Sequence, residues 1–158
     1  MKRSILCVFL IVVAISFAGS AASQTPNKST QQDEFRSLID RYYTAWNTGN
    51  PDNAAPLYAQ DDDLVFYDLT PLKYIGWAAY DAGFRKVIAS FASARFTPQQ
   101  DFKVMRRGTI AWTMVTWHLS GKKKTGEAVE LDGRHTAIWE NRGGKWLIVH
   151  EHFSAPLS

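Results

Sequence analysis

The C-terminal third of the chain holds all four of its histidines, the side chains best suited to acid–base chemistry near neutral pH. Two of them, His150 and His152, are two residues apart, so on a β-strand both would point to one face. The segments around them are rich in tryptophan and isoleucine. Titratable groups on strands that also carry large apolar side chains indicate the wall of a pocket rather than an ordinary core.

Histidines on neighbouring strands also raise the question of a metal site. Zinc is bound by such ligands, with acidic partners such as Glu151 or Asp132 behind them. The His-x-His spacing alone is a weak signal, and buried histidines more often hydrogen-bond to the backbone or to other side chains. We therefore predict no metal and no cofactor.

Residues 141–144, Asn-Arg-Gly-Gly, separate two alternating aromatic runs and predict a β-hairpin. With a two-residue or a four-residue turn, one face carries His135, Ala137, Trp139, Trp146, Ile148, His150 and His152. The other face carries Arg134, Thr136, Ile138, Leu147, Val149 and Glu151. A β-bulge would swap this arrangement, so the sequence leaves open which set faces the interior.

The first 23 residues have the features of a secretory signal peptide. Lys2 and Arg3 precede an apolar stretch over residues 5–17, and small residues follow it. We expect cleavage near Ala22 or Ser23, which places the mature protein in the periplasm or outside the cell. The alternative is an uncleaved membrane anchor, but a membrane span needs about 20 apolar residues, and no later apolar stretch indicates a membrane protein.

Removal of this segment changes the charge and the cysteine count. The chain has 18 Lys and Arg against 15 Asp and Glu, and loss of Lys2 and Arg3 leaves 16 against 15, a net charge of +1. That balance gives no electrostatic reason to expect a nucleic-acid partner. Cys7 is the one cysteine, so disulfides and thiol catalysis are excluded for the mature domain. The basic run 122–124 lies beside glycines and fits a solvated hairpin loop.

The mature chain has the length of one domain, with a polar, flexible lead-in over 24–32 and a folded part over 33–158. Apolar spacing predicts helices over 33–48, 52–58 and 77–94. Strands are predicted over 64–67, 102–105, 110–119, 128–139 and 146–153. Helices followed by a strand meander indicate an α+β fold: a cone-shaped, curved antiparallel sheet with the N-terminal helices packed on its concave face. The open mouth of such a cone is where a small molecule would bind.

Two stretches carry a family resemblance. Residues 42–49 (Tyr-Tyr-Thr-Ala-Trp-Asn-Thr-Gly) and the closing stretch 144–156 resemble the SnoaL-like group of the nuclear transport factor 2-like superfamily, and the order of elements agrees over 35–156. The closing stretch also resembles the end of the association domain of calcium/calmodulin-dependent protein kinase II. The resemblance implies the cone fold. It selects no activity, because the superfamily includes isomerases, cyclases, dehydratases and non-catalytic binding or assembly domains.

Ketosteroid isomerase, another member of the superfamily, suggests catalytic positions. By that resemblance Asp68 falls near the carboxylate that moves a proton, and Tyr42 falls on the tyrosine that holds the enolate oxygen. The third group, a neutral carboxylic acid, falls near Thr136, which cannot play that part. His150 is a second candidate base. The alternatives are a core position for Tyr42 and a turn-forming role for Asp68.

Six further residues are predicted to contact a ligand: Trp46, Trp77, His118, Arg134, His135 and His152. The guanidinium of Arg134, facing into an apolar cone, would hold a carboxylate or developing negative charge. The alternative is a cross-strand pair of Arg134 with Glu151.

The expected function is therefore an exported cone domain that binds a small, partly apolar molecule and transfers a proton on a carbonyl compound. The alternative is a non-catalytic module for ligand binding or oligomerisation. The fold implied by the resemblance favours a homodimer through the outer sheet face. No nucleic-acid partner is expected, and no membrane partner after signal cleavage.

Overall fold

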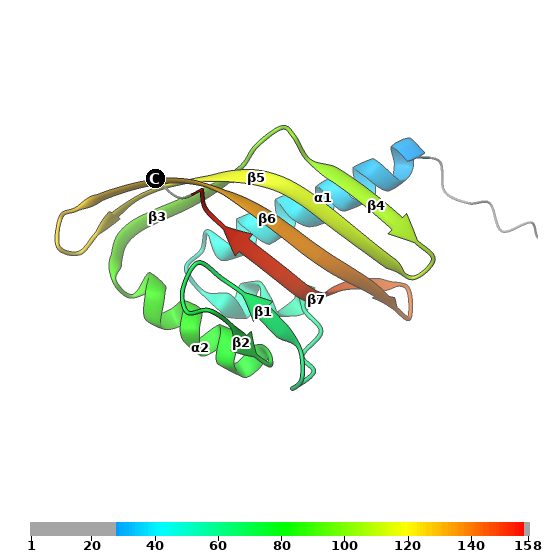
Figure 1. The fold of residues 1–158 in the computed structure, drawn as a ribbon, viewed down its shortest axis with the longest axis horizontal. Helices are drawn as coiled ribbons and strands as arrows, with labels where there is room; N and C mark the ends of the chain where they lie inside the picture. The colour runs from blue at the N-terminus through cyan, green and yellow to red at the C-terminus, as the bar shows by residue number, and fades with distance from the viewer. Residues whose placement is uncertain (1–27, 157–158) are drawn as a thin grey trace, which may run out of the picture.

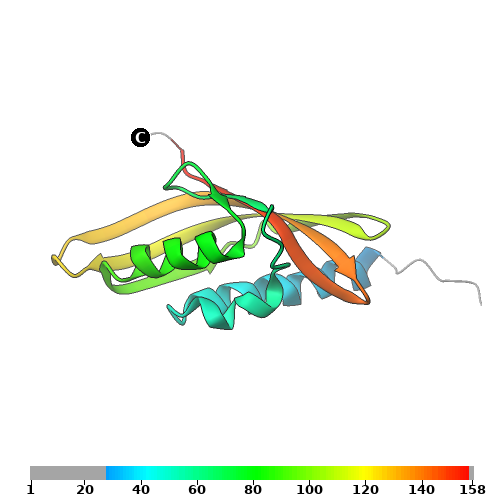
Figure 2. The same cartoon turned by 90° about the horizontal axis from the view of Figure 1, so that it is seen from below.

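The computed structural model describes residues 28–156, which form two helices packed on one face of a curved sheet (Figure 1). Helix α1 spans Lys28–Trp46 and helix α2 spans Trp77–Ile88. Two single-turn 3-10 helices, Pro51–Asn53 and Ala55–Leu57, follow α1. Figure 2 shows both helices on the same side of the sheet. The predicted α+β class is confirmed.

The sheet has the strand order β2-β1-β7-β6-β5-β3, and β4 pairs with the other half of β5. The strands are β1 Val65–Tyr67, β2 Tyr74–Ile75, β3 Phe91–Pro98, β4 Lys103–Arg107, β5 Ile110–Lys123, β6 Ala128–Arg142 and β7 Lys145–Ser154. Among these strands the pairings are antiparallel, as predicted, except that β1 and β7 run parallel. Because β1 and β7 are far apart in sequence, no tight turn forces them to run in opposite directions.

One face of the sheet is covered and the other is open, and strand β5 shows this most clearly. Its buried residues alternate with half-buried or exposed ones, and they are Ala111, Thr113, Val115, Trp117 and Leu119. A period of two is what a strand with one covered face requires. The long strands β5 and β6 bend as they twist, so their covered faces form the concave side of the predicted cone (Figure 1).

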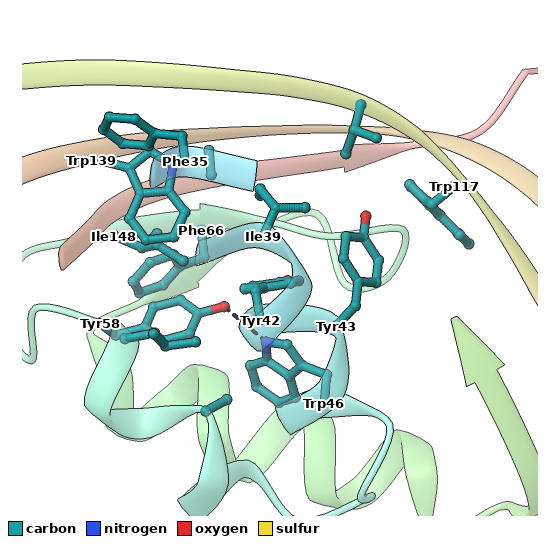
Figure 3. Packing of buried hydrophobic residues seen from close by; sticks show 14 of the residues in the cluster. Phe35, Ile39, Tyr42, Tyr43, Trp46, Tyr58, Phe66, Trp117, Trp139 and Ile148 are labelled. Carbon is teal, nitrogen blue, oxygen red and sulfur yellow. Dashed lines mark hydrogen bonds between the residues drawn. The ribbon is translucent and has the colours of Figure 1, made fainter. Parts of the chain in front are cut away.

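Helix α1 buries a stripe of side chains against the concave face. The stripe has the spacing of three and four residues expected of an amphipathic helix, and it consists of Phe35, Ile39, Tyr42, Tyr43 and Trp46. Figure 3 shows Phe35 beside Trp139 of the sheet, with the stripe running on from there through Tyr42 to Trp46. Burying each large apolar side chain stabilises the fold by about 1.5–3 kcal/mol. In the turn just after α1, Gly49 has a φ of +71°, a left-handed conformation that glycine adopts without strain.

The bounds of both long helices differ from the predicted ones. Helix α1 begins at Lys28, so residues 28–32, expected in a flexible lead-in, are helical. Helix α2 ends at Ile88, and the residues after it form strand β3 at the edge of the sheet. Phe91 and Ala94 keep a spacing that suits a helix, but backbone hydrogen bonds to β5 decide the outcome.

The smaller elements also differ. The predicted helix over 52–58 is two 3-10 turns, because Pro56 has no N–H to continue a helical ladder. The first predicted strand and the four later ones are confirmed as β1 and β4–β7, while β2 and β3 were not predicted. Lys122 and Lys123, predicted in a loop, lie at the end of β5.

The predicted signal peptide, residues 1–23, lies outside the described residues. Between Lys28 and Pro156, no helix combines the length and the apolar character needed to cross a membrane.

Candidate functional site

A pocket of about 230 Å³ lies between α2, β3 and the curled ends of β5 and β6. Its walls are almost entirely apolar, with Phe84 from α2, Phe96 from β3 and Trp117 from β5 among them. Tyr42 and Tyr43 of α1 line its inner side. An engineered apolar cavity of about 150 Å³ in another protein binds benzene. This pocket is therefore large enough for a molecule of one or two fused rings.

Asp68 lies at the mouth of the pocket. Two exposed lining residues mark this opening: Leu69, which is 43% exposed, and Val87, which is 39% exposed. The parallel pairing of β1 with β7 brings Asp68 here, since Tyr67, the last residue of β1, pairs with His152, and both Asp68 and Phe153 line the pocket. A carboxyl group thus stands at the entrance of an apolar hollow.

The environment of Asp68 makes its carboxyl group unusually basic. Burial raises the pKa of Asp68 to about 6, and the charge of Glu151 acts in the same direction. A hydrogen bond from the Leu69 N–H to Oδ1, 2.7 Å long, opposes them. Asp68 therefore forms the turn contact expected of an aspartate in that loop and also lines the pocket. At neutral pH it is ionised, yet it accepts a proton more readily than an ordinary aspartate.

Behind the pocket lies a second carboxyl group, Glu151, which is fully buried. The hydroxyl of Tyr58 donates to both of its oxygens at 2.9 Å, and the hydroxyl of Tyr80 donates to Oε1. Trp46 donates its indole N–H to the Tyr58 oxygen at 3.1 Å, the dashed line in Figure 3. A buried carboxylate is tolerated only with such partners. Sequence analysis assigned Glu151 no catalytic or binding role.

His135 joins the same buried network from strand β6. Its ring is stacked between Phe153 and Tyr42, with centroid distances of 4.2 and 4.9 Å. Its Nε2 lies 3.5 Å from Oε2 of Glu151, and a hydrogen on Nε2 is attracted by the carboxylate, whereas a lone pair there would be repelled. We therefore assign the hydrogen to Nε2. Nδ1 then accepts the hydroxyl of Tyr43 at 3.2 Å.

The tyrosines of this network keep their hydrogens. Burial, and then the nearby charge of Glu151, raises the pKa of Tyr42, Tyr58 and Tyr80 well above the usual value near 10. The pKa of Tyr43 rises for the same two causes. All four hydroxyl groups therefore act as neutral donors and acceptors near neutral pH.

A β-bulge in strand β7 decides which ionisable residues face inward. Ile138 pairs with His150 but Trp139 pairs with Ile148, so Val149 is an extra residue on β7. After the bulge Glu151 faces the interior together with His135, and His152 faces outward. This is the swap that the sequence left open, and it removes two histidines from the interior.

Several predicted site residues consequently lie elsewhere. His150 and His152 are on the outer face of the sheet, where both pack against Tyr67 and His150 Nδ1 lies 2.7 Å from the Val65 carbonyl oxygen. Their predicted place in the pocket is wrong, because the bulge turns them away from it. Arg134 is exposed on the same face, opposite Ser154, so its predicted pair with Glu151 is wrong as well.

His118 and Trp77 are also outside the pocket. His118 faces outward between two carboxylates, with Nδ1 2.8 Å from Asp132 and Nε2 2.9 Å from Glu130, because outer positions of β5 and β6 pair there. Trp77 begins α2 and packs on Tyr58, with a centroid distance of 4.5 Å, so it supports the network without lining the hollow.

The remaining four predicted residues lie in or next to the pocket. Tyr42, Trp46 and Asp68 line the pocket, and His135 lies directly behind Tyr42. Besides Glu151, sequence analysis missed Tyr43, Tyr80 and Trp117 as lining or network residues. Their apolar spacing was visible, but it predicts burial and does not distinguish a pocket wall from a core. Between Lys28 and Pro156, no group of three histidine, cysteine or acidic residues is placed to hold a metal ion.

With this geometry, comparison with known proteins is informative. Residues 35–158 match the model of the SnoaL-like domain family. The chain belongs to this family. A search of curated proteins finds no match.

Solved structures share the fold of this SnoaL-like domain. A nuclear transport factor 2-like superfamily protein from Salmonella enterica has a TM-score of 0.76 at 20% identity, covering 84% of this chain and 95% of that one. A Xanthomonas campestris protein, proposed to be a calcium/calmodulin-dependent protein kinase II association domain, has a TM-score of 0.67 at 25% identity, covering 78% and 86%. A proposed dehydratase from Streptomyces avermitilis has a TM-score of 0.71 at 15% identity, covering 84% and 100%. These names differ, so the SnoaL-like fold alone selects no activity.

Proposed function

We propose that this SnoaL-like domain is an exported protein that binds a small, mainly apolar ring compound and transfers a proton next to its carbonyl group. Asp68 is the base in this proposal. It takes a proton from the carbon beside the carbonyl and returns it to a different carbon of the same molecule, so the product is an isomer and nothing else is consumed.

The observation that carries this proposal is the position of Asp68 at the mouth of an apolar pocket with its pKa raised to about 6. General bases work best when their pKa lies near the working pH. A carboxylate beside an apolar hollow is also less well hydrated than one in bulk solvent. It therefore removes a proton from a weakly acidic C–H group more readily.

Trp117 supplies a candidate partner for the carbonyl oxygen. Its indole N–H is buried and has no acceptor among residues 28–156. The side chain lines the pocket. An unpaired buried donor costs free energy in the empty protein, so an acceptor on a ligand would relieve that cost. Arg134, the earlier candidate for this task, lies on the wrong face of the sheet.

The test uses 2-tetralone, a fused two-ring ketone with acidic hydrogens beside its carbonyl. In D₂O, NMR measures how fast those hydrogens exchange. The wild-type domain should accelerate the exchange, and Asp68→Asn should lose on the order of 10²-fold or more of that acceleration. Asp63→Asn is the matched control, because Asp63 is exposed and does not line the pocket. Exchange in Asp68→Asn as fast as in the wild type, with ligand still bound, contradicts the role of Asp68.

A second candidate function is a binding module without catalysis. The buried network favours it, because Glu151, Tyr58 and Trp46 already satisfy one another and leave no free base behind the pocket. A ligand that binds tightly but exchanges no hydrogen in the same NMR experiment would favour this function.

The proposal includes a homodimer and export. The outer sheet face carries Met105, which is 43% exposed, beside the half-buried Trp112 and Met114, and apolar groups on an open sheet face favour a self-association surface. Native mass spectrometry of protein purified from its host tests the subunit count, any retained ligand or metal, and the loss of about 23 N-terminal residues in one measurement.

A further inference from the structure

Of the three tyrosines that line the pocket, two have hydroxyl hydrogens already committed to the interior. Tyr80 donates its hydrogen to Oε1 of Glu151. Tyr43 donates its hydrogen to Nδ1 of His135, given the hydrogen on Nε2 that the carboxylate favours. Neither hydroxyl can therefore donate to a ligand without breaking a buried hydrogen bond.

The oxygen atoms of the same two hydroxyl groups still have acceptor capacity. A hydroxyl oxygen has two lone pairs, and no group among residues 28–156 donates to the oxygen of Tyr43 or of Tyr80. Tyr58 provides the contrast: its oxygen accepts the indole N–H of Trp46, and it does not line the pocket. Of the three tyrosines that line the pocket, Tyr43 and Tyr80 thus combine a committed hydrogen with an unused lone pair.

The direction of these two hydroxyl hydrogen bonds is fixed by charge as well as by geometry. Glu151 is fully buried, and turning the Tyr80 hydroxyl away from it would leave this buried carboxylate with one donor fewer. Tyr43 is linked to the same charge less directly, through His135, whose Nε2 lies 3.5 Å from Oε2 of Glu151 without a hydrogen bond. Glu151 therefore acts as a positioning residue for the pocket without lining it.

We infer that the pocket selects ring compounds that carry a hydroxyl group as hydrogen-bond donor, of the phenol or enol class, with that hydroxyl donating to Tyr80 or Tyr43. The inference rests on the proposed pocket function and narrows it. The enol tautomer of a carbonyl compound belongs to the same class, because its oxygen already carries a hydrogen that these tyrosines accept. The enolate that Asp68 would form carries none, and its oxygen would need the Trp117 N–H instead.

The test compares 2-naphthol with 2-methoxynaphthalene, which differ in the hydroxyl hydrogen and one methyl group. Isothermal titration calorimetry should show 2-naphthol binding on the order of tenfold more tightly, as expected for one buried hydrogen bond. Naphthalene, which has neither group, measures the apolar contribution of the pocket and should bind about as weakly as the ether.

Three variants locate the acceptors. Tyr80→Phe and Tyr43→Phe should each reduce the preference for 2-naphthol, and the double variant should bring it to about twofold or less. Tyr67→Phe is the matched control and should keep the full preference, because Tyr67 is 41% exposed on the opposite face of the sheet.

Glu151→Gln tests the positioning role with a side chain of the same size. Its amide can donate to the Tyr80 oxygen, which uses the lone pair and frees the tyrosine hydrogen for the ligand. The preference should then shrink or reverse, an effect that loss of stability alone does not produce.

The outcomes separate this inference from the proposed function. Equal binding of 2-naphthol and 2-methoxynaphthalene to the wild type overturns the inference and leaves the pocket as a binding site. A preference that survives the double tyrosine variant also overturns it. Failure of all three naphthalenes to bind overturns both this inference and the proposed pocket function.

Discussion

The hydroxyl of Tyr58 lies 2.9 Å from both carboxylate oxygens of Glu151, although 93 residues separate the two in the chain. The contact ties the turn after α1 to the last strand of the sheet. Tyr80 reaches the same carboxylate from α2, so one buried acid connects three parts of the cone. The stability of the fold and the hydrogen-bond direction of the tyrosine hydroxyls in the pocket consequently both depend on Glu151.

Glu151→Ala should lower the free energy of unfolding by about 3 kcal/mol, because it leaves the buried hydroxyls of Tyr58 and Tyr80 without an acceptor. Urea unfolding followed by far-ultraviolet circular dichroism measures the change. Glu127→Ala is the control, since its exposed ion pair with Lys123 contributes about 0.5 kcal/mol or less. Equal effects of the two substitutions would contradict the central place of Glu151.

Gly133→Ala should reduce the affinity of the pocket for two-ring ligands. Trp117 packs against Gly133, its neighbour across the strands, and a Cβ added there would stand 2.3 Å from the Trp117 ring and 2.8 Å from the Ser154 carbonyl oxygen. The indole must then move off the sheet, and because it forms a wall of the pocket, the hollow changes shape. Calorimetry with 2-naphthol should show a loss of about tenfold or more.

The control for that variant is Thr136→Ala, which lies on the outer side of the same strand. Its affinity should match the wild type. Unchanged affinity in Gly133→Ala would mean that Trp117 does not shape the binding site.

Asp68→Asn should stabilise the protein at pH 8 and leave its stability nearly unchanged at pH 3. The pKa of Asp68 is raised from 3.8 to about 6 in the folded state, mainly by burial. Near pH 3 and below, Asp68 is mostly protonated in both states and its burial costs little. The cost of burying its charge develops between pH 4 and 6, and above pH 6 it reaches about 3 kcal/mol as an upper limit.

Urea titrations at the two pH values measure this difference. Asp101→Asn should behave in the opposite way, because a hydrogen bond from the Thr116 N–H lowers the pKa of Asp101. That carboxylate stabilises the fold above its unfolded pKa, and the stabilisation is lost as the pH falls. A gain in stability of Asp68→Asn that is the same at both pH values would exclude the buried charge as its cause.

His118 should titrate above the ordinary range for histidine. Hydrogen bonding to Asp132, and then to Glu130, raises its pKa. Since the folded pKa is the higher one, the stabilisation is present below the unfolded pKa and disappears as the pH rises through the folded value. NMR titration of the imidazole should show Asp132→Asn lowering the pKa, while Asp63→Asn leaves it unchanged.

Much of the fold follows from local patterns in the sequence. The spacing of Phe35, Ile39 and Trp46 predicted α1 and its buried face, and the alternation around Trp117 and Trp139 predicted the long strands. These segments bury one continuous face, so a simple periodicity describes them. Phe91 was assigned to a helix because its position in a strand depends on pairing with Lys123, 32 residues further along the chain, which no local pattern contains.

The site was less predictable than the fold for the same reason. Asp68 and Tyr42 were placed by resemblance and do line the pocket. Glu151 was not assigned a site role, because regular alternation put it on the face of Arg134, opposite His135 and His150, and did not decide which face was interior. The extra residue at Val149 reverses that order after the middle of β7, and its cause is the pairing with β6 rather than any turn-forming residue nearby.

That single irregularity at Val149 has a consequence for how this protein can change over evolutionary time. Deletion of one residue there would turn His150 and His152 to the interior and Glu151 to the outer face. The identities of these ionisable residues would all stay the same. Homologues aligned by residue identity alone would then look alike at their C-terminal ends while presenting opposite acid–base character to whatever they bind.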